Sequence, residues 1–203
     1  MLPFLLVYLA LALFYLATQQ RRLPAHFLIK ALPILLLAIW NSNSSGWVVA
    51  ALLFSAVGDI ALALDGERYF VIGLGAFLLG HLCYIAAFLQ NPAFQPVSLL
   101  PIMIILLLGG VVTWQLWPHL GKLKVPVVVY IVVSMGMGVS ASLQRPFSWL
   151  AVVGAITFML SDTGIAVDKF LRPFPHRDFL VMSSYYLAQL LITLGFVLSQ
   201  TQL

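Results

Sequence analysis

SLLPIMIILLLGGVVTWQLW, residues 98–117, is a stretch of 20 residues without a single charge. A helix that crosses a bilayer needs about 20 predominantly apolar residues, and a helix satisfies all of its backbone hydrogen bonds within the segment. Comparable runs recur along the chain, which is 63% hydrophobic and only 8% charged over 203 residues. A soluble domain is roughly 45–50% apolar and about 25% charged. The composition therefore excludes a soluble enzyme, a disordered chain and a nucleic-acid-binding domain.

Eight apolar segments are predicted to be transmembrane helices. They cover residues 2–18, 26–40, 47–64, 70–90, 98–117, 125–142, 148–167 and 179–198. Short stretches with turn-forming or charged residues separate them, and the alternating ten-residue strands of a membrane β-barrel are not found. We therefore expect an all-α polytopic membrane protein, with residues 1–203 forming one integral membrane domain.

The distribution of Lys and Arg predicts the orientation. Nine of the ten basic residues fall on one side of the predicted spans: Arg21, Arg22, Lys30, Arg68, Lys122, Lys124, Lys169, Arg172 and Arg177. Only Arg145 falls on the other side. Because basic residues collect in cytoplasmic loops, both termini should be extracytoplasmic, and in a bacterium the protein should lie in the inner membrane.

Two similar motifs indicate an internal repeat. Asp59-Ile-Ala-Leu-Ala-Leu-Asp65 follows Gly58, and Asp162-Thr-Gly-Ile-Ala-Val-Asp168 follows Ser161, at an offset of 103 residues. Each motif lies near the end of a predicted helix and precedes a helix with polar groups at mid-membrane. We expect two parallel four-helix pseudo-repeats, at about residues 1–97 and 98–203.

Asp59 and Asp162 are the candidate catalytic residues. A carboxylate at membrane depth costs about 2.5–3.5 kcal/mol on insertion scales, so two acids at corresponding positions need an explanation. One interpretation is a shared polar site between their two helices. The other is that each acid caps or pairs near a helix end, close to water. Asp65 and Asp168 are interpreted as solvated charges at helix ends.

Lys30, His81 and Tyr84 are further candidates in the first half of the chain. Lys30 either extends its ammonium to the membrane interface or pairs with a lipid phosphate or an intramembrane aspartate. His81 and Tyr84 lie one turn apart on one predicted helix. They either take part in a site or are hydrogen-bonded within the bundle.

Tyr130, Tyr186 and Gln189 are the candidates in the second half. Tyr186 and Gln189 repeat the spacing of His81 and Tyr84, although polar residues at such positions also hold helices together. Tyr130 has an alternative interpretation as a core tyrosine. The four histidines are dispersed, which argues against a three-histidine metal site, and no G-x-S-x-G nucleophile motif is present.

At these residues the sequence resembles the lysoplasmalogenase family of small integral membrane proteins. The matching motifs are Phe54-Ser-Ala-Val-Gly-Asp59, the Gly-x-x-x-Phe…His-x-x-Tyr pattern within Phe70 to Phe88, Phe158-Met-Leu-Ser-Asp162 and Tyr186-Leu-Ala-Gln-Leu-Leu-Ile192. Lys30-Ala-Leu-Pro33 resembles the family's Lys-Pro-x-Pro, with Ala31 in place of the first proline. The resemblance covers nearly the whole chain.

The resemblance implies a hydrolase that cleaves the vinyl ether bond of lysoplasmalogens. Its products would be a fatty aldehyde and glycerophosphoethanolamine or glycerophosphocholine. By the same resemblance Asp59 and Asp162 are catalytic, and the substrate-binding residues are Lys30, His81, Tyr84, Tyr130, Tyr186 and Gln189. The lysophospholipid substrate and membrane lipids are the implied partners, and no metal or organic cofactor is implied.

The chemistry of a vinyl ether agrees with paired carboxyl groups. Protonation of the terminal alkene carbon generates an oxocarbenium ion, water adds to it, and the hemiacetal collapses to an aldehyde. One protonated carboxylic acid and one carboxylate serve this sequence, as in glycoside hydrolysis. The acids and the basic face would place the lipid head group near Lys30 or the basic loops. The alkenyl chain would run past His81 and Tyr84, with Gly80 bordering it.

A small proton-coupled lipid or solute transporter is the alternative function. Parallel repeats and intramembrane acids are found in such proteins as well. The two classes differ in their product, because only the enzyme releases aldehyde in detergent without a membrane gradient.

Overall fold

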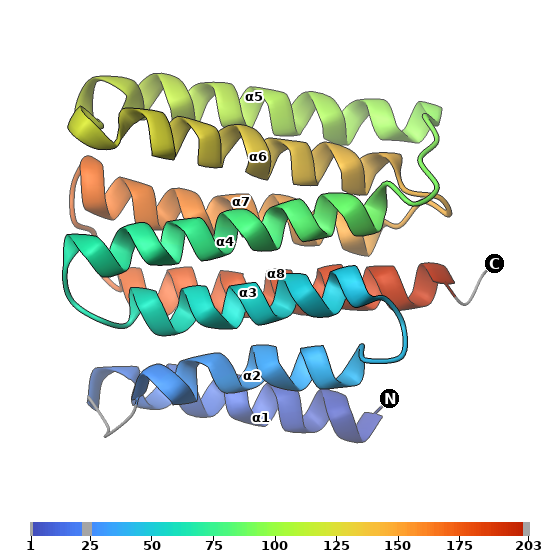
Figure 1. The fold of residues 1–203 in the computed structure, drawn as a ribbon, viewed down its shortest axis with the longest axis horizontal. Coiled ribbons are helices and arrows are strands. Elements are labelled where there is room, and N and C mark those ends of the chain that lie inside the picture. Colours follow the sequence, from blue (N-terminus) through green and yellow to red (C-terminus); the bar gives the residue numbers. More distant parts are fainter. Residues whose placement is uncertain (1, 22–25, 201–203) are drawn as a thin grey trace. The chain divides into compact units, whose positions relative to one another are not determined.

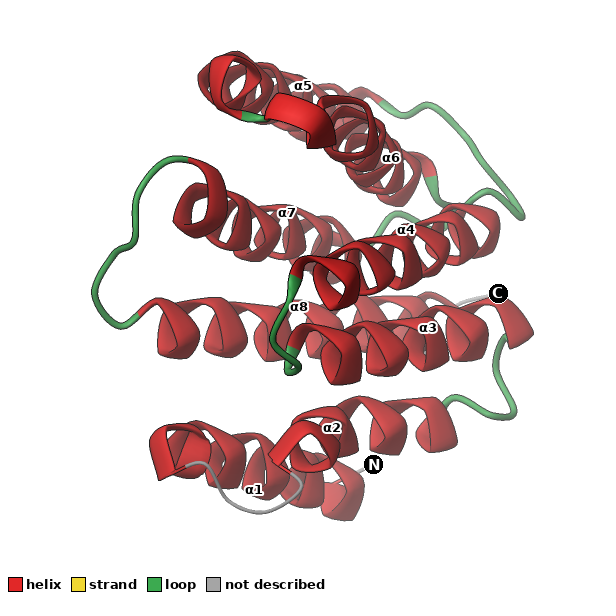
Figure 2. Ribbon diagram, turned by 60° about the vertical axis from the view of Figure 1, so that its left-hand side comes forward, coloured by secondary structure: helices red, strands yellow, loops and turns green. Residues whose placement is uncertain are grey.

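The computed structural model describes residues 2–21 and 26–200, and this part of the chain is built from helices and short connections (Figures 1 and 2). The α-helices are α1 (Leu2–Thr18), α2 (His26–Trp40), α3 (Gly46–Leu62), α4 (Glu67–Phe88), α5 (Leu99–Leu116), α6 (Lys124–Leu143), α7 (Trp149–Phe170) and α8 (Arg177–Gln200). The predicted all-α class is confirmed, and each boundary lies within three residues of its prediction. Arg22, one of the predicted topology signals, lies outside the described residues.

Five helical segments of the described chain are long and apolar enough to cross a membrane. They are Glu67–Phe88, Pro96–His119, Gly121–Leu143, Trp149–Phe170 and Arg177–Ser199. The segments of α1, α2 and α3 are shorter, at 15 to 17 residues. With five such segments, the chain is an integral membrane protein.

The chain divides into two compact units, Met1–Ala87 and Phe88–Leu203. The first unit contains α1 to α3 and α4 up to its last residue, and the second contains α5 to α8. Within the first unit α2 packs against both α1 and α3, and within the second α7 packs against both α6 and α8. Each unit is therefore a helical assembly with its own set of polar residues.

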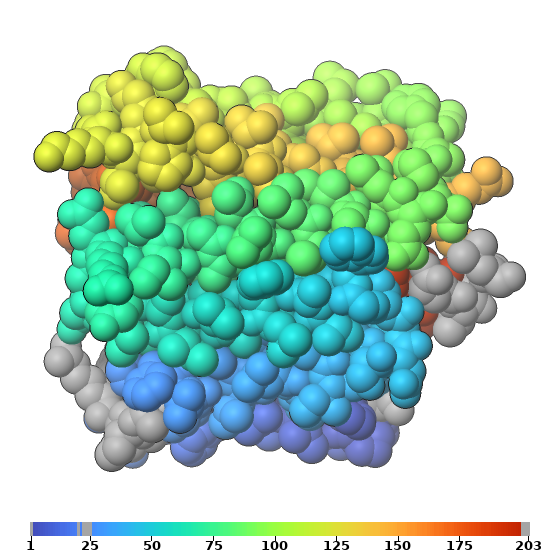
Figure 3. All heavy atoms as spheres, in the orientation of Figure 1, coloured from blue at the N-terminus to red at the C-terminus, as the bar shows by residue number. Residues whose placement is uncertain are grey.

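In the first unit, glycines and a phenylalanine bring α3 and α4 together. A Cβ atom on Gly58 would lie 2.6 Å from the ring of Phe77, and one on Gly73 would lie 2.7 Å from the Leu62 side chain. Gly73 and Phe77 are four residues apart, so they lie on one face of α4. The space-filling view shows the atoms of α2, α3 and α4 closely packed on the face that is visible (Figure 3).

In the second unit, α7 and α8 approach so closely that backbone meets backbone. A Cβ atom on Gly154 would lie 2.7 Å from the amide nitrogen of Ile192, and one on Gly195 would lie 2.4 Å from that of Ala151. Small residues at helix contacts are typical of membrane proteins, because association there depends on close packing and not on a hydrophobic driving force.

The first prediction concerns this contact. Gly154→Leu should lower the thermal unfolding temperature of the purified protein, because the new side chain meets rigid backbone of α8. Overpacking of this kind typically costs about 1–3 kcal/mol. Gly75→Leu is the matched control, since a Cβ atom on Gly75 has no neighbour within 4 Å. Equal unfolding temperatures for the two variants would show that the α7–α8 contact does not limit stability.

Candidate active site

A buried ion pair joins α2 and α3 in the first unit. Lys30 is the fifth residue of α2, Asp59 lies in the last turn of α3, and the Lys30 Nζ atom is 3.7 Å from the Asp59 Oδ1 atom. The relative exposure of the two residues is 7% and 1%. Of the interpretations of Lys30 open from the sequence, the structure therefore shows pairing with an intramembrane aspartate. Neither charge is left alone in the low-dielectric interior.

The two predicted residues of α4 are also buried in the first unit. His81 and Tyr84 are each 1% exposed. The His81 Nδ1 atom lies 2.7 Å from the carbonyl oxygen of Phe77. A carbonyl oxygen only accepts, so Nδ1 carries the hydrogen, and in a neutral imidazole Nε2 is then the acceptor nitrogen. The ring is held in one orientation by its own helix.

Tyr8 of α1 belongs to the same polar region and was not singled out from the sequence. It is 2% exposed, and its hydroxyl interacts electrostatically with Asp59 and with Tyr84. The available signal was a tyrosine in the middle of an apolar segment, with Tyr15 two turns further along the helix. A tyrosine there needs a hydrogen-bonding partner for its hydroxyl, which marks it as a candidate.

In the second unit, a short hydrogen bond joins α6 and α7. The Tyr130 hydroxyl donates to the Asp162 Oδ2 atom at 2.6 Å. Tyr130 is buried and Asp162 is half-buried, two turns before the end of α7. Next to Asp162, the Ser161 hydroxyl donates to the carbonyl oxygen of Val181 at 2.9 Å and so ties α7 to α8.

An aromatic cluster surrounds the predicted residues of α8. The rings of Tyr185 and Tyr186 have centroids 5.6 Å apart, and Tyr185 meets Phe158 of α7 edge to face at 5.4 Å. The Gln189 Nε2 atom donates to the Tyr185 hydroxyl at 3.4 Å. Tyr186 and Gln189 are both buried, at 3% and 0% exposure. Tyr185, which links these residues, was not predicted from the sequence, because the spacing of His81 and Tyr84 recurs at Tyr186 and Gln189 and not at Tyr185.

The other two acids of the paired motifs behave differently from each other. Asp65 is exposed after the end of α3, as expected. Asp168 was expected to be a solvated charge at a helix end, but α7 continues to Phe170, and its Oδ2 atom lies 3.4 Å from the Arg177 Nε atom at the start of α8. Asp178 also pairs with Arg177. The Asp168–Arg177 pair links the end of α7 to the start of α8, whereas Arg177 and Asp178 are neighbours within α8.

Gly80 packs against α3 instead of bordering an open channel. A Cβ atom at this position would lie 3.1 Å from the carbonyl oxygen of Ala51 and 3.3 Å from the Ser55 hydroxyl. The glycine allows α4 to approach α3, so a larger residue would disturb helix packing.

Each unit therefore holds one carboxyl group inside its helices, and the two carboxyl groups have different partners. Asp59 faces an ammonium group, which stabilises its charged form, whereas Asp162 accepts a hydrogen bond from a neutral phenol. Two carboxyl groups in unlike environments are the usual basis for separate acid and base roles.

The second prediction concerns the ion pair. Lys30→Met should strongly destabilise the protein, by about 3–5 kcal/mol, because it leaves the Asp59 carboxylate buried without its counter-charge. The double variant Lys30→Met/Asp59→Asn should recover most of that stability. Thermal unfolding in one detergent compares the variants. A double variant no more stable than Lys30→Met would mean that the charge of Asp59 is compensated by other groups.

Comparison with known proteins identifies the family of the chain. The YhhN family model matches residues 25–196. Over 159 residues the chain is 42% identical to "Lysoplasmalogenase" from Mycobacterium bovis, a match that covers 74% of this chain and 60% of that relative. It is 34% identical over 192 residues to "Lysoplasmalogenase TMEM86A" from Bos taurus, covering 85% and 78% of the two chains. It is 38% identical over 175 residues to "Lysoplasmalogenase TMEM86B" from Homo sapiens, covering 83% and 74%.

No solved structure matches the chain. The match to the mycobacterial relative leaves two fifths of that protein's length uncovered, whereas the two mammalian relatives are covered over about three quarters of theirs. The family model matches most of the chain, and the relatives are more than 30% identical to it. Both comparisons give the same assignment. The chain belongs to the YhhN family and, with these relatives, to the lysoplasmalogenase family.

Proposed function

We propose that this protein is a membrane hydrolase that cleaves the vinyl ether bond of lysoplasmalogens. The products are a fatty aldehyde and glycerophosphoethanolamine or glycerophosphocholine. The observation that carries the proposal is the similarity to lysoplasmalogenases from a bacterium and from mammals over most of the chain. Carboxyl groups held inside the helices, Asp59 and Asp162, supply the chemistry that this reaction needs.

The reaction begins with transfer of a proton to the alkene carbon that is not bonded to oxygen. The carbon bonded to oxygen then carries the positive charge, shared with the ether oxygen as an oxocarbenium ion. Water adds to that carbon while a carboxylate takes a proton from the water. The hemiacetal that results loses the glycerol oxygen as an alcohol, which leaves the aldehyde.

We assign the two acids different roles on the basis of their partners. Asp162, which accepts a hydrogen bond from the neutral Tyr130 hydroxyl, is the proton donor. Asp59, which lies 3.7 Å from the Lys30 ammonium, is the carboxylate that stabilises the cation and activates water. The hydrogen bond from Tyr130 orients the Asp162 Oδ2 atom, and with it the carboxyl group that donates the proton.

Six other polar residues bind the substrate in this proposal. They are Lys30, His81, Tyr84, Tyr130, Tyr186 and Gln189. All six are buried within apolar helices. Aromatic side chains can line the path of the alkenyl chain while their polar atoms contact the glycerol and head group. Tyr8 joins this set because it lies near Asp59 and Tyr84.

The third prediction tests the function directly. Purified protein in detergent should release fatty aldehyde from lysoplasmalogen and not from the intact, two-chain plasmalogen. Asp59→Asn and Asp162→Asn should each reduce kcat by about 10²–10⁴-fold, because an amide keeps the shape of the side chain but neither donates a carboxylic proton nor carries the charge. Aldehyde measured by a coupled dehydrogenase assay gives the rate.

Asp65→Asn is the matched control, because Asp65 is an exposed acid of the same motif. Its rate should stay close to that of the wild type. A wild-type rate in either buried-acid variant would overturn the paired-carboxyl mechanism. Absence of aldehyde from the folded wild type would favour the alternative, a proton-coupled transporter of lipids or solutes.

We further propose that all eight helices span the membrane, with both termini extracytoplasmic and, in a bacterium, in the inner membrane. At a rise of 1.5 Å per residue, α2 with 15 residues is about 22 Å long, shorter than a hydrocarbon core of about 30 Å. Local thinning of the bilayer accommodates such a helix at modest cost. The division into units of four helices supports one membrane domain made of two parallel pseudo-repeats.

The fourth prediction concerns this topology. A periplasmic reporter fused after α8 should be active and a cytoplasmic reporter inactive, because the basic connections between helices mark the cytoplasmic side. A fusion in the α5–α6 connection, beside Lys122, is the matched control and should give the opposite result. Cytoplasmic activity of the C-terminal fusion would mean that an odd number of helices cross the membrane or that the orientation is reversed.

A further inference from the structure

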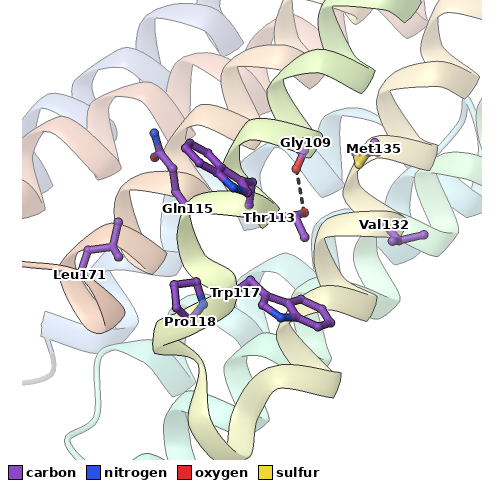
Figure 4. A pocket seen from close by; sticks show the side chains of 10 residues that line it. Gly109, Thr113, Gln115, Trp117, Pro118, Val132, Met135 and Leu171 are labelled. Carbon is purple, nitrogen blue, oxygen red and sulfur yellow. Dashed lines mark hydrogen bonds between the residues drawn. The ribbon is translucent and has the colours of Figure 1, made fainter.

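A groove of about 910 Å³ lies in the second unit, at the C-terminal half of α5, beside α6 and the end of α7 (Figure 4). Its lining residues are Gly109, Gly110, Thr113, Trp114, Gln115, Trp117, Pro118, Val132, Met135 and Leu171. Neither Tyr130 nor Asp162 belongs to this lining. The volume falls within the range of small-molecule sites, roughly 300–1,000 Å³.

The interior of the groove is suited to a hydrocarbon chain. The Thr113 hydroxyl donates to the carbonyl oxygen of Gly109 at 2.7 Å, so this polar group is satisfied within α5 (Figure 4). Gly110 faces open space, since a Cβ atom there would have no neighbour within 4 Å. From Gly109 to Gln115 the groove follows α5 for about 9 Å at 1.5 Å per residue.

Basic side chains lie at one end of this groove. The Lys124 Nζ atom lies 4.6 Å from the ring centroid of Trp117, one of the lining residues. Lys122 is exposed two residues before it, and Arg172 is exposed directly after the lining residue Leu171. Trp114 and Trp117 are 76% and 51% exposed, as expected for tryptophans at a membrane interface.

The acids of the second unit are engaged elsewhere. Asp162 accepts a hydrogen bond from Tyr130, and Asp168 and Asp178 both pair with Arg177. Within the described part of the chain, Lys122, Lys124 and Arg172 have no carboxylate at ion-pair distance. The end of the groove therefore carries positive charge that an external anion can neutralise.

We propose that this groove binds an anionic glycerophospholipid of the surrounding bilayer. The lipid phosphate lies between Lys122 and Lys124, where it forms charge-assisted hydrogen bonds with the ammonium groups. One acyl chain follows α5 from Trp117 towards Gly109. Basic pockets between transmembrane helices are typical binding sites for anionic head groups. The lipid is a bound partner and not a substrate, so the proposal stands independently of the catalytic activity.

The fifth prediction is a lipid preference measured by native mass spectrometry. Wild-type protein in detergent, given equal amounts of phosphatidylglycerol and phosphatidylcholine with identical chains, should retain the phosphatidylglycerol. Each lysine should contribute about fivefold to the preference. Lys122→Gln should therefore reduce it about fivefold, and Lys122→Gln/Lys124→Gln should nearly abolish it. Gly110→Leu, which fills the groove, should reduce retention of both lipids.

Matched controls separate this site from a general effect of charge or bulk. Arg145→Gln removes an exposed cation at the other end of α6, and Gly75→Leu adds bulk at an open glycine of α4. Both should leave the preference unchanged, and size-exclusion chromatography and circular dichroism should show that each variant is folded. Three results would overturn the proposal. The wild type could retain the two lipids equally, or Arg145→Gln could lose as much preference as Lys122→Gln. The wild type could also be a dimer without bound lipid, with a second copy of the chain covering the groove.

Discussion

The absence of water from the bilayer interior is the constraint on which this structure depends. Each backbone amide and carbonyl in the apolar core must find its partner within the protein, which favours uninterrupted helices. Burying a polar side chain at the same depth costs free energy unless it is hydrogen-bonded. The hydroxyl groups of Thr113 and Ser142 therefore donate to carbonyl oxygens of their own helices, and longer polar side chains reach across to neighbouring helices.

In the described part of the chain, two of the polar contacts between helices involve the acids of the proposed site. Lys30 and Asp59 link α2 with α3, while Tyr130 and Asp162 link α6 with α7. An apolar pair of similar volume would often be at least as stable as a buried ion pair. The proposed reaction gives a reason to retain charged groups at these positions, and in that proposal the two acids act as proton donor and carboxylate according to their unlike partners.

The helices could be predicted closely from sequence because their signal is composition over about 20 residues, which turn-forming residues interrupt clearly. The residues of the candidate site could be predicted from the sequence only in part. Asp59, Asp162 and Lys30 stand out because charge is rare in apolar segments, but the Lys30–Asp59 partnership depends on how α2 meets α3. Tyr8 and Tyr185 could not be predicted, because a tyrosine is common in membrane helices and its role depends on what its hydroxyl and ring contact. The same applies to Gly80, whose close approach to Ala51 is a property of two helices.

The Lys30–Asp59 ion pair also has a consequence for biogenesis. Each of these residues alone raises the free energy of transferring its helix from the translocon into lipid, whereas the pair enters as a neutral unit. Only Asn41 to Ser45 separate α2 from α3, so the two helices can meet as soon as both have left the ribosome. The two helices should thus enter the bilayer together as a helical hairpin, with the pair formed before either charge meets the acyl chains.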